Sequence, residues 1–256
     1  MNLAQRTAVI TGGASGLGEA TVQRFVRHGA NVVILDLNRP RGEALAASLG
    51  SQVAFQATDI TRPEEVQLGI DYACQQFGSI HVLVNCAALP AAMKTTDTTR
   101  GPHHLDLFRR VIDVNLVGTF DVIRTATTRM LANEPDGEGE RGVIINTASA
   151  AAFDGQVGQV AYAASKAAIA GMTLPMARDL AEYGIRVCTI APGLFDTPML
   201  GTLPEKVRQS LARMVPFPMR LGKPDEYARL AQHVVENPML NGEVIRLDGA
   251  LRMPPR

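Results

Sequence analysis

The sequence contains few cysteines and no excess of charge of either sign. Its three cysteines, Cys74, Cys86 and Cys188, are odd in number and include no CxxC pair, which argues against a disulfide framework and against a zinc site. The 25 basic and 25 acidic residues cancel, which argues against a nucleic-acid partner recruited by phosphate neutralisation. We therefore expect a protein of a reducing compartment that binds no nucleic acid.

Long hydrophobic runs are also absent. No apolar run approaches the roughly 20 residues needed to span a bilayer, and the first residues lack a basic segment followed by an apolar one. We expect no membrane contact and an intracellular location: the cytoplasm or, in a eukaryote, the mitochondrial matrix. At 256 residues with 46% hydrophobic side chains, one large domain over 1–256 is the simplest organisation.

Short runs rich in β-branched residues alternate with longer stretches of helical period. The expected strands are 7–11, 32–35, 53–57, 81–84, 143–146, 186–190 and 243–247, and the expected helices are 18–28, 40–49, 63–77, 104–132, 156–183 and 224–236. This alternation is typical of a parallel sheet covered by helices on both faces. The sequence therefore predicts an α/β fold: a single-domain, Rossmann-type, doubly wound parallel sheet of about seven strands. Residues 88–103 and 133–142 are interpreted as polar loops.

A glycine-rich turn follows the first expected strand. Its glycines, at 12, 13, 16 and 18, permit turns with positive φ and let backbone N–H groups and a helix N-terminus approach a pyrophosphate. An ordinary tight turn would use the same residues, but Asp36 ends the second expected strand, where a carboxylate would bind the diol of an adenosine ribose. Such a carboxylate repels a 2′-phosphate, so NAD is expected rather than NADP. The alternative is that Asp36 caps the helix near Pro40.

Motifs along the whole chain resemble those of the short-chain dehydrogenase/reductase family. Besides the glycine turn, Asp36 and Asp59, they are Asn85-Cys-Ala-Ala88, Asn115, Ser149, Tyr162-Ala-Ala-Ser-Lys166 and Pro192-Gly193. Longer matches, including 141–149, 152–159 and 241–249, are similar to members that oxidise 3-hydroxyacyl-CoA thioesters. The resemblance implies an NAD-dependent oxidoreductase that interconverts an alcohol and a ketone, with (S)-3-hydroxyacyl-CoA as substrate, hydroxysteroids as further candidates, and a homotetrameric assembly. Ala88 departs from the family, which usually has glycine there.

Tyr162 and Lys166 are four residues apart in an expected helix, and so lie on one face. Oxidation of an alcohol by hydride transfer needs a base for the hydroxyl proton. A free tyrosine, with a pKa of about 10, stays protonated at neutral pH unless a neighbouring ammonium stabilises the phenolate. Ser149, after the strand at 143–146, is expected to donate a hydrogen bond to the substrate oxygen, so Ser149 and Tyr162 are the expected substrate-binding residues. The resemblance adds Asn115, which in the family holds a water that links the lysine to solvent.

Each of these four residues also has a structural explanation on its own: an amphipathic helix edge, a turn residue or a solvent-facing polar side chain. Their joint presence in the family's order favours catalysis. The expected cofactor contacts, several carried over from the resemblance, are Gly12, Ser15, Gly16, Leu17, Gly18, Asp36, Asp59, Ile60, Cys86, Tyr162, Lys166, Phe195 and Thr197. Cys86 is interpreted as a small buried thiol and not as a nucleophile.

Residues 197–220 combine apolar side chains with three prolines and are expected to cover the substrate, although a short helix packed on the domain would fit equally well. The apolar side chains are Met199, Leu200, Leu203, Leu211, Met214, Val215, Phe217 and Met219. Three cations there, Lys206, Arg208 and Arg213, are candidates for CoA phosphates or simply a solvated face. Asp196 adds a charge near the nicotinamide end. No metal is expected, because His103-His104 point apart on a helix and hydride transfer needs none.

Two other functions use the same features. One is a 3-oxoacyl-carrier-protein reductase that uses NADPH; Asp36, with no basic residue beside it, argues against this. The other is a non-catalytic scaffold or sensor that binds a dinucleotide. A scaffold has no need of an activated phenolate, so the set Asn115, Ser149, Tyr162 and Lys166 argues against it.

Overall fold

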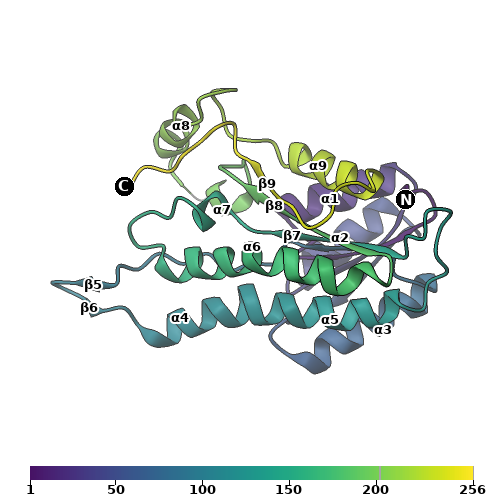
Figure 1. Cartoon of the computed structure of the whole chain (residues 1–256). Coiled ribbons are helices and arrows are strands. Elements are labelled where there is room, and N and C mark those ends of the chain that lie inside the picture. Colours follow the sequence, from purple (N-terminus) through teal and green to yellow (C-terminus); the bar gives the residue numbers. More distant parts are fainter. Residues whose placement is uncertain (202, 256) are drawn as a thin grey trace.

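A seven-stranded parallel sheet forms the centre of the computed structural model, which describes residues 1–201 and 203–255 (Figure 1). Its strands are β1 (Thr7–Thr11), β2 (Asn31–Asp36), β3 (Val53–Ala57), β4 (Val82–Asn85), β7 (Gly142–Thr147), β8 (Ile185–Pro192) and β9 (Val244–Leu247). They lie in the order β3-β2-β1-β4-β7-β8-β9. The predicted Rossmann-type α/β fold is confirmed.

Helices cover both faces of the sheet (Figure 1). One face carries α1 (Gly16–Arg27), α2 (Arg39–Leu49) and α9 (Pro224–Glu236), and the other carries α3 (Pro63–Phe77), α5 (Thr119–Met130) and α6 (Val160–Ala181). Alternate residues of each central strand enter the core on one face or the other, as Val9 and Ile10 do in β1. Because both faces are buried, these strands are continuous hydrophobic runs.

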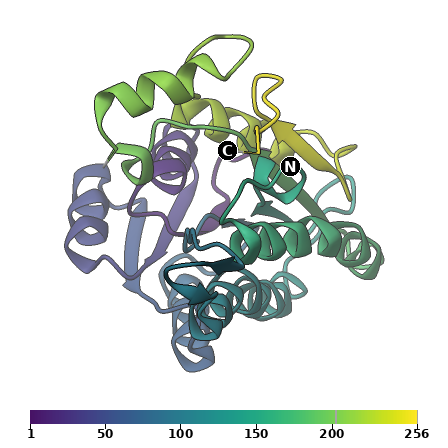
Figure 2. The ribbon, with the colours of Figure 1, turned by 90° about the vertical axis from the view of Figure 1, so that its left-hand side faces the viewer.

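The chain reverses its direction of travel across the sheet between β3 and β4. From β1 it adds β2 and β3 on one side, and it then crosses to add β4, β7, β8 and β9 on the other. Loops that leave the carboxyl ends of β1 and β4 therefore diverge, which opens a crevice at this edge of an α/β sheet. Seen from this side, α8 (Glu205–Arg213) and the small hairpin of β5 (Thr96–Asp97) and β6 (Gly101–Pro102) lie on opposite sides of the sheet's edge (Figure 2).

Two expected segments differ from their description. The helix predicted over 104–132 is α4 (Leu105–Ile112), a π-helical turn η1 (Asp113–Gly118) and α5. Gly118 allows η1 to pack closely against Ile60, because a Cβ at this position would lie 2.7 Å from the Ile60 carbonyl oxygen. The loop expected over 88–103 contains the two-residue strands β5 (Thr96–Asp97) and β6 (Gly101–Pro102), whose turn closes on hydrogen bonds from Thr99 to the Asp97 carboxylate.

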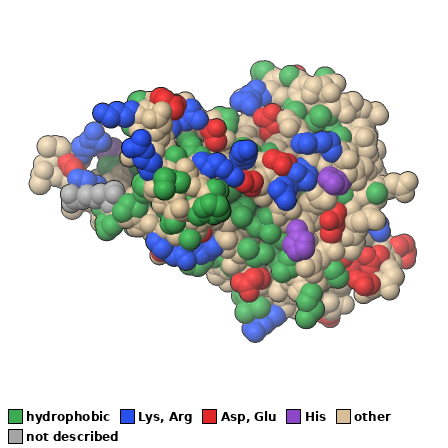
Figure 3. Space-filling view, turned by 90° about the horizontal axis from the view of Figure 1, so that it is seen from above, with side chains coloured by type: hydrophobic (Ala, Val, Ile, Leu, Met, Phe, Trp, Pro, Cys, Tyr) green, Lys and Arg blue, Asp and Glu red, His purple; other side chains and the backbone are tan. Residues whose placement is uncertain are grey.

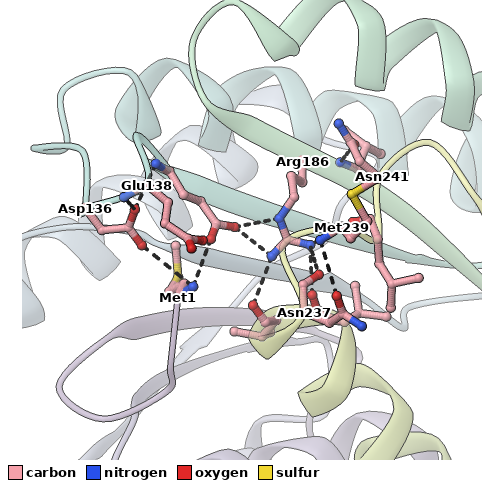
Figure 4. A network of polar contacts seen from close by, with 12 residues as sticks. Met1, Asp136, Glu138, Arg186, Asn237, Met239 and Asn241 are labelled. Carbon is pink, nitrogen blue, oxygen red and sulfur yellow. Dashed lines mark hydrogen bonds and ion pairs between the residues drawn. The ribbon is translucent and has the colours of Figure 1, made fainter.

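A buried ion pair ties the amino ends of the strands to α9, far from the crevice (Figure 4). The Arg186 guanidinium of β8 lies 2.6 Å from the Glu140 carboxylate and donates to backbone carbonyls at the end of α9, including that of Val234 at 2.8 Å. Glu140 also accepts from the Met1 ammonium at 3.0 Å. Since every charge here is paired and hydrogen-bonded, the attraction between the charges offsets the desolvation cost of burying them.

The remaining helices are short: η2 (Ala150–Ala152), a 3₁₀ turn after β7, and α7 (Pro198–Gly201), which follows β8. Within residues 1–201 and 203–255, no helix combines the length and apolar character that a membrane crossing requires.

Candidate active site

A cavity of about 680 Å³ lies at the carboxyl ends of the strands. Segments that follow β1, β2, β3, β4, β7 and β8 line it, together with α6 and α7. The residues expected to contact the cofactor all line it: Gly12, Ser15, Gly16, Leu17, Gly18, Asp36, Asp59, Ile60, Cys86, Tyr162, Lys166, Phe195 and Thr197. Ser149 lines it as well, so the structure brings residues from across the chain to one space.

The glycine turn leaves no room for side chains. A Cβ at Gly12 would lie 2.7 Å from the Ala87 nitrogen, and one at Gly18 would lie 2.2 Å from the Gly12 carbonyl oxygen. Gly12 and Gly16 also have φ of +64° and +57°, a backbone conformation that residues with a side chain rarely adopt. The turn therefore exposes backbone to the cavity at the N-terminus of α1, and this cradle fits the pyrophosphate of a dinucleotide.

Asp36 ends β2 beside the glycine turn. Its carboxylate accepts hydrogen bonds from the Ala14 N–H at 3.0 Å and from the Asn38 N–H at 2.8 Å. The side chain that caps α2 is that of Asn38, which accepts from the Arg41 N–H at 3.2 Å. The alternative that Asp36 caps this helix is wrong, because its carboxylate holds the turn instead.

The cations nearest in sequence to Asp36 are occupied elsewhere. The Arg39 guanidinium lies 3.2 Å from the Glu43 carboxylate, and that of Arg41 lies 3.1 Å from the Glu19 carboxylate. None of the ion pairs among the described residues includes Asp36. Its carboxylate therefore stays negatively charged, with no paired cation, at this end of the cavity.

Asp59 and Ile60 lie at the same end. The Asp59 carboxylate accepts from the Thr61 N–H at 2.9 Å and from the Thr61 hydroxyl at 2.7 Å. Burial acts to raise the pKa of Asp59, but these hydrogen bonds and the Arg110 and Arg62 charges outweigh it and lower the pKa. Arg110 itself lines the cavity; the sequence analysis missed it, because a cation on an amphipathic helix has no distinguishing pattern.

Tyr162 and Lys166 lie on one face of α6, as expected. The Lys166 Nζ lies 5.9 Å from the centre of the Tyr162 ring and donates to the Thr147 carbonyl oxygen at 2.7 Å. Ser149 follows Thr147 closely at the end of β7, with extended backbone, and its Oγ accepts from the Ala151 N–H at 3.1 Å. The hydroxyl of Ser149 and the phenol of Tyr162 thus face the same part of the cavity.

Burial changes the acidity of both groups on α6. It lowers the pKa of Lys166 to about 8, so the ammonium still predominates at pH 7. Burial raises the pKa of Tyr162, although a hydrogen bond with Ser149 acts in the opposite direction. The chain's own groups therefore keep the phenol protonated, and a further positive charge beside it is needed to form the phenolate.

Asn115 is fully buried in the π-helical turn and does not line the cavity. Its Oδ1 accepts from the Leu89 N–H at 2.7 Å, and its Nδ2 donates to the Leu89 carbonyl at 3.1 Å and to the Ser165 Oγ at 3.0 Å. Asn115 therefore clamps the loop after β4 against α6. Its expected water-binding role stays a prediction.

Ala88 fits this loop without strain. Gln5 and Ala250 are the non-glycine residues with positive φ among those described, so Ala88 has an ordinary backbone conformation. The methyl group that replaces the family's usual glycine is tolerated here.

Among residues 1–201 and 203–255, no cluster of metal-ligating side chains occurs, and the Nδ1 of His103 is engaged with the His104 carbonyl oxygen at 2.9 Å.

The segment 197–220 contains α7, which lines the cavity through Pro198 and Leu200, and α8, none of whose residues lines it. Of the apolar side chains expected to cover a substrate, Leu200 lines the cavity, whereas Phe217 is 81% exposed and Met219 is 69% exposed; the side chain of Met199 lies outside the described part. The Arg208 guanidinium lies 2.7 Å from the Asp196 carboxylate. This ion pair neutralises both Asp196 and Arg208, which is one of the cations considered for the CoA phosphates.

Gln159 and Met253 also line the cavity, and the sequence analysis named neither. Gln159 lies one turn before Tyr162, so its helical spacing was an available signal. Met253 comes from the C-terminal segment, where Gln156 and Val157 donate to the carbonyls of Pro254 and Pro255. No local pattern predicts that return of the chain.

Comparison with known proteins agrees with this architecture. A sequence model of the short chain dehydrogenase family matches residues 6–208. The chain is 60% identical over 249 residues to 3-hydroxyacyl-CoA dehydrogenase type-2 of Homo sapiens, covering 97% of this chain and 95% of that protein. The solved structure of 3-hydroxyacyl-CoA dehydrogenase type-2 from Mycobacterium avium has a TM-score of 0.94 at 42% identity and covers 98% of this chain and 97% of that chain. A 3-ketoacyl-(acyl-carrier-protein) reductase from Brucella melitensis, solved in complex with NADH, has a TM-score of 0.88 at 28% identity and covers 98% and 100%.

Proposed function

The chain belongs to the short-chain dehydrogenase/reductase family, and from this premise we propose that it oxidises (S)-3-hydroxyacyl-CoA thioesters to 3-oxoacyl-CoA with NAD. That it is an oxidoreductase with a nicotinamide dinucleotide cofactor follows from the family match over residues 6–208. The observation that carries the proposal is the meeting of Tyr162, Lys166 and Ser149 in a cavity that begins at the glycine turn. The names of the similar proteins support the substrate class.

In the proposed reaction, side chains of the protein bind the substrate hydroxyl and accept its proton. The Ser149 hydroxyl donates a hydrogen bond to the substrate oxygen and stabilises the charge that develops there. The Tyr162 phenolate accepts the hydroxyl proton, and the Lys166 ammonium stabilises that phenolate through space. The nicotinamide, when bound, supplies the hydride acceptor and, in its oxidised form, the additional positive charge that Tyr162 requires.

NAD is proposed over NADP because of Asp36. Its carboxylate lies at the cavity end that the fold assigns to the adenosine ribose. A 2′-phosphate would meet this negative charge while Arg39 and Arg41 are engaged with other carboxylates. A 3-oxoacyl-carrier-protein reductase is the alternative reading, and relatives of that name show lower identity, such as 34% for the Thermotoga maritima protein.

Recognition of the CoA phosphates is proposed to depend on a few cations. Seen from above, Lys and Arg side chains are interspersed with Asp and Glu (Figure 3). Several cations of the chain are paired: Arg24 with Asp225, Arg208 with Asp196 and Arg220 with Glu226. With no net field to attract an anionic thioester, the acyl and pantetheine parts should contribute most of the affinity.

Reduction of acetoacetyl-CoA tests the proposed activity. We expect rapid loss of NADH absorbance on adding acetoacetyl-CoA, and a much slower loss with NADPH, because Asp36 repels the 2′-phosphate. The pantetheine thioester of acetoacetate, which lacks only the nucleotide of CoA, should be reduced with a similar kcat and a higher KM. A strong preference for NADPH would favour the carrier-protein reductase, and binding without turnover would favour a scaffold.

A homotetramer is proposed from the apolar side chains that α4 to α6 leave in solvent. On the face where α6 packs beside η1, Val117 is 54% exposed, Phe120 is 46% exposed and Leu174 is 45% exposed. Large apolar side chains left exposed on neighbouring helices are typical of protein interfaces, and the tetrameric assembly itself is taken from the resemblance to the family. Light scattering should give four times the 27.4 kDa chain mass, and Phe120→Glu should yield smaller species; a monomer at micromolar concentration would contradict the proposal.

A reducing location, the cytoplasm or the mitochondrial matrix of a eukaryote, is part of the proposal. It is supported by the free thiols of Cys74, Cys86 and Cys188. Neither nucleic acid nor a membrane is proposed as a partner, since the 25 basic and 25 acidic residues cancel.

A further inference from the structure

Tyr227 lies on α9 and has no exposed surface. Its hydroxyl lies 2.7 Å from the Thr147 Oγ1 and 3.7 Å from the Cys86 Sγ, and the last two atoms are 3.6 Å apart. One arrangement of protons satisfies all three groups. The Thr147 hydroxyl donates to the Cys86 sulfur, the Cys86 thiol donates to the Tyr227 oxygen, and the Tyr227 phenol donates to the Thr147 oxygen. The three side chains form a closed ring of hydrogen bonds, called the Tyr227 ring below.

The Tyr227 ring lies directly behind the reacting groups. Cys86 and Thr147 line the cavity, whereas Tyr227 does not. The peptide of Thr147 connects the ring to catalysis, because its carbonyl oxygen accepts the Lys166 Nζ hydrogen bond at 2.7 Å. Thr147 is the last residue of β7. Its peptide is held in the sheet by the Ala148 N–H, which donates to the Ile190 carbonyl oxygen at 2.8 Å, and the Thr147 side chain adds a second attachment from the α9 face.

We propose that Tyr227 is a positioning residue for Lys166: through Thr147 it holds the carbonyl that orients the ammonium toward Tyr162. This inference rests on the proposed catalytic roles of Lys166 and Tyr162. Tyr227 itself touches neither residue, and it reaches the site from the face of the sheet opposite to α6. The ring therefore couples the placement of α9 to the geometry of the catalytic pair.

The electrical neutrality of the ring matters as much as its geometry. The titratable groups that face the Lys166 ammonium are Tyr162 on its own helix and Cys86 after β4, with Tyr227 of α9 behind them. Burial raises the pKa of the Cys86 thiol and raises that of Tyr227 well above its ordinary value. Both stay neutral near pH 8, so the ring orients Lys166 without cancelling the charge that Tyr162 requires.

Removal of one hydroxyl from the ring tests the inference. In Tyr227→Phe the Thr147 side chain loses a partner, the carbonyl hydrogen bond to Lys166 weakens, and the pKa of Lys166 falls. Less positive charge then faces Tyr162, so its pKa rises. We expect kcat for 3-hydroxybutyryl-CoA oxidation to fall roughly tenfold, KM for NAD to change little, and the acidic limb of kcat/KM to move up by about 0.5 pH units.

Four further variants separate positioning from simple loss of stability. Thr147→Val, which removes the hydroxyl and keeps the carbonyl, should shift the acidic limb as Tyr227→Phe does, and the double variant should shift it no further. Thr147→Ser should recover most of the loss. Tyr183→Phe removes a phenol that is 43% exposed and serves as the matched control for the substitution.

An unshifted acidic limb in Tyr227→Phe and Thr147→Val would overturn the inference, even if the melting temperature of both variants fell. This outcome differs from failure of the proposed function, in which Tyr162→Phe itself would keep its turnover. A shift in both single variants that adds in the double variant would also overturn the inference, since groups of one ring must act as a unit.

Discussion

Replacement of Tyr162 by phenylalanine is expected to lower kcat for 3-hydroxybutyryl-CoA oxidation by a factor of about 10³ or more. The change removes the hydroxyl that accepts the proton and leaves the aromatic ring of residue 162 in place, so the cavity and the glycine turn keep their shape. Steady-state turnover and fluorescence titration with NADH would measure the two effects separately. We expect the dissociation constant of NADH to change by less than about threefold.

Phenylalanine at Tyr183 is the matched control here as well, because that residue lies outside the cavity lining. Near-normal turnover in Tyr162→Phe would contradict the assignment of the base. A loss of NADH binding would instead show that the phenol shapes the cofactor site, and the loss of turnover would then say nothing about proton transfer.

The pH profile follows from the same assignment. Oxidation requires the phenolate, so its rate should rise as pH passes upward through the apparent pKa of Tyr162, whereas ketone reduction requires the phenol and should slow. Burial raises the pKa of Tyr162, and a hydrogen bond with Ser149 acts to lower it. In the proposed mechanism the Lys166 ammonium, whose own pKa burial lowers to about 8, lowers the pKa of Tyr162 further. Lys166→Met, which removes that charge, should move the oxidation profile to higher pH.

Asp36→Asn is expected to reduce the preference for NAD over NADP by a factor between about 10 and 100. Asparagine keeps an oxygen that can accept from the Ala14 or Asn38 N–H, so the turn should survive while the charge disappears. Most of the change should appear as a lower KM for NADP. The ratio of kcat/KM for the two cofactors is the quantity to measure.

Asp106→Asn makes the same change of charge at a side chain that is 97% exposed on α4, and it should leave the cofactor ratio unaltered. An Asp36→Asn variant with the original ratio would mean that discrimination comes from the shape of the cavity. Loss of both cofactors together would mean that Asp36 acts mainly by holding the glycine turn.

Local patterns in the sequence predicted the strands of the central sheet and most of the long helices. The expected strand 7–11 and helices 63–77 and 224–236 agree with β1, α3 and α9 at both ends. Side-chain periodicity and the prolines at first-turn positions act over a few residues, so they are visible in the sequence. The four-residue step from Tyr162 to Lys166 is equally local, and it brought the two groups to one helix face.

Other features depend on contacts that no short window contains. The π-helical turn that contains Asn115 is attached to Leu89, 26 residues away, by a hydrogen bond from the Leu89 N–H to the Asn115 side chain. The pairing of Asp196 with Arg208 crosses from the end of β8 to α8. In both places the local residues are compatible with several arrangements, and packing against a distant segment selects one of them.

The sequence by itself therefore determined the class of fold, and it predicted the glycine turn proposed to hold a pyrophosphate and the side chains proposed to react, because each depends on residue type and short spacing. Only the tertiary structure decided how those side chains are held. Cys86, Thr147 and Tyr227 come from three separate segments of the chain, up to 141 residues apart. Hydrogen bonds between such residues exist only after the sheet has closed, since the chain entropy of bringing them together is overcome by burial of the whole core and not by the three groups themselves.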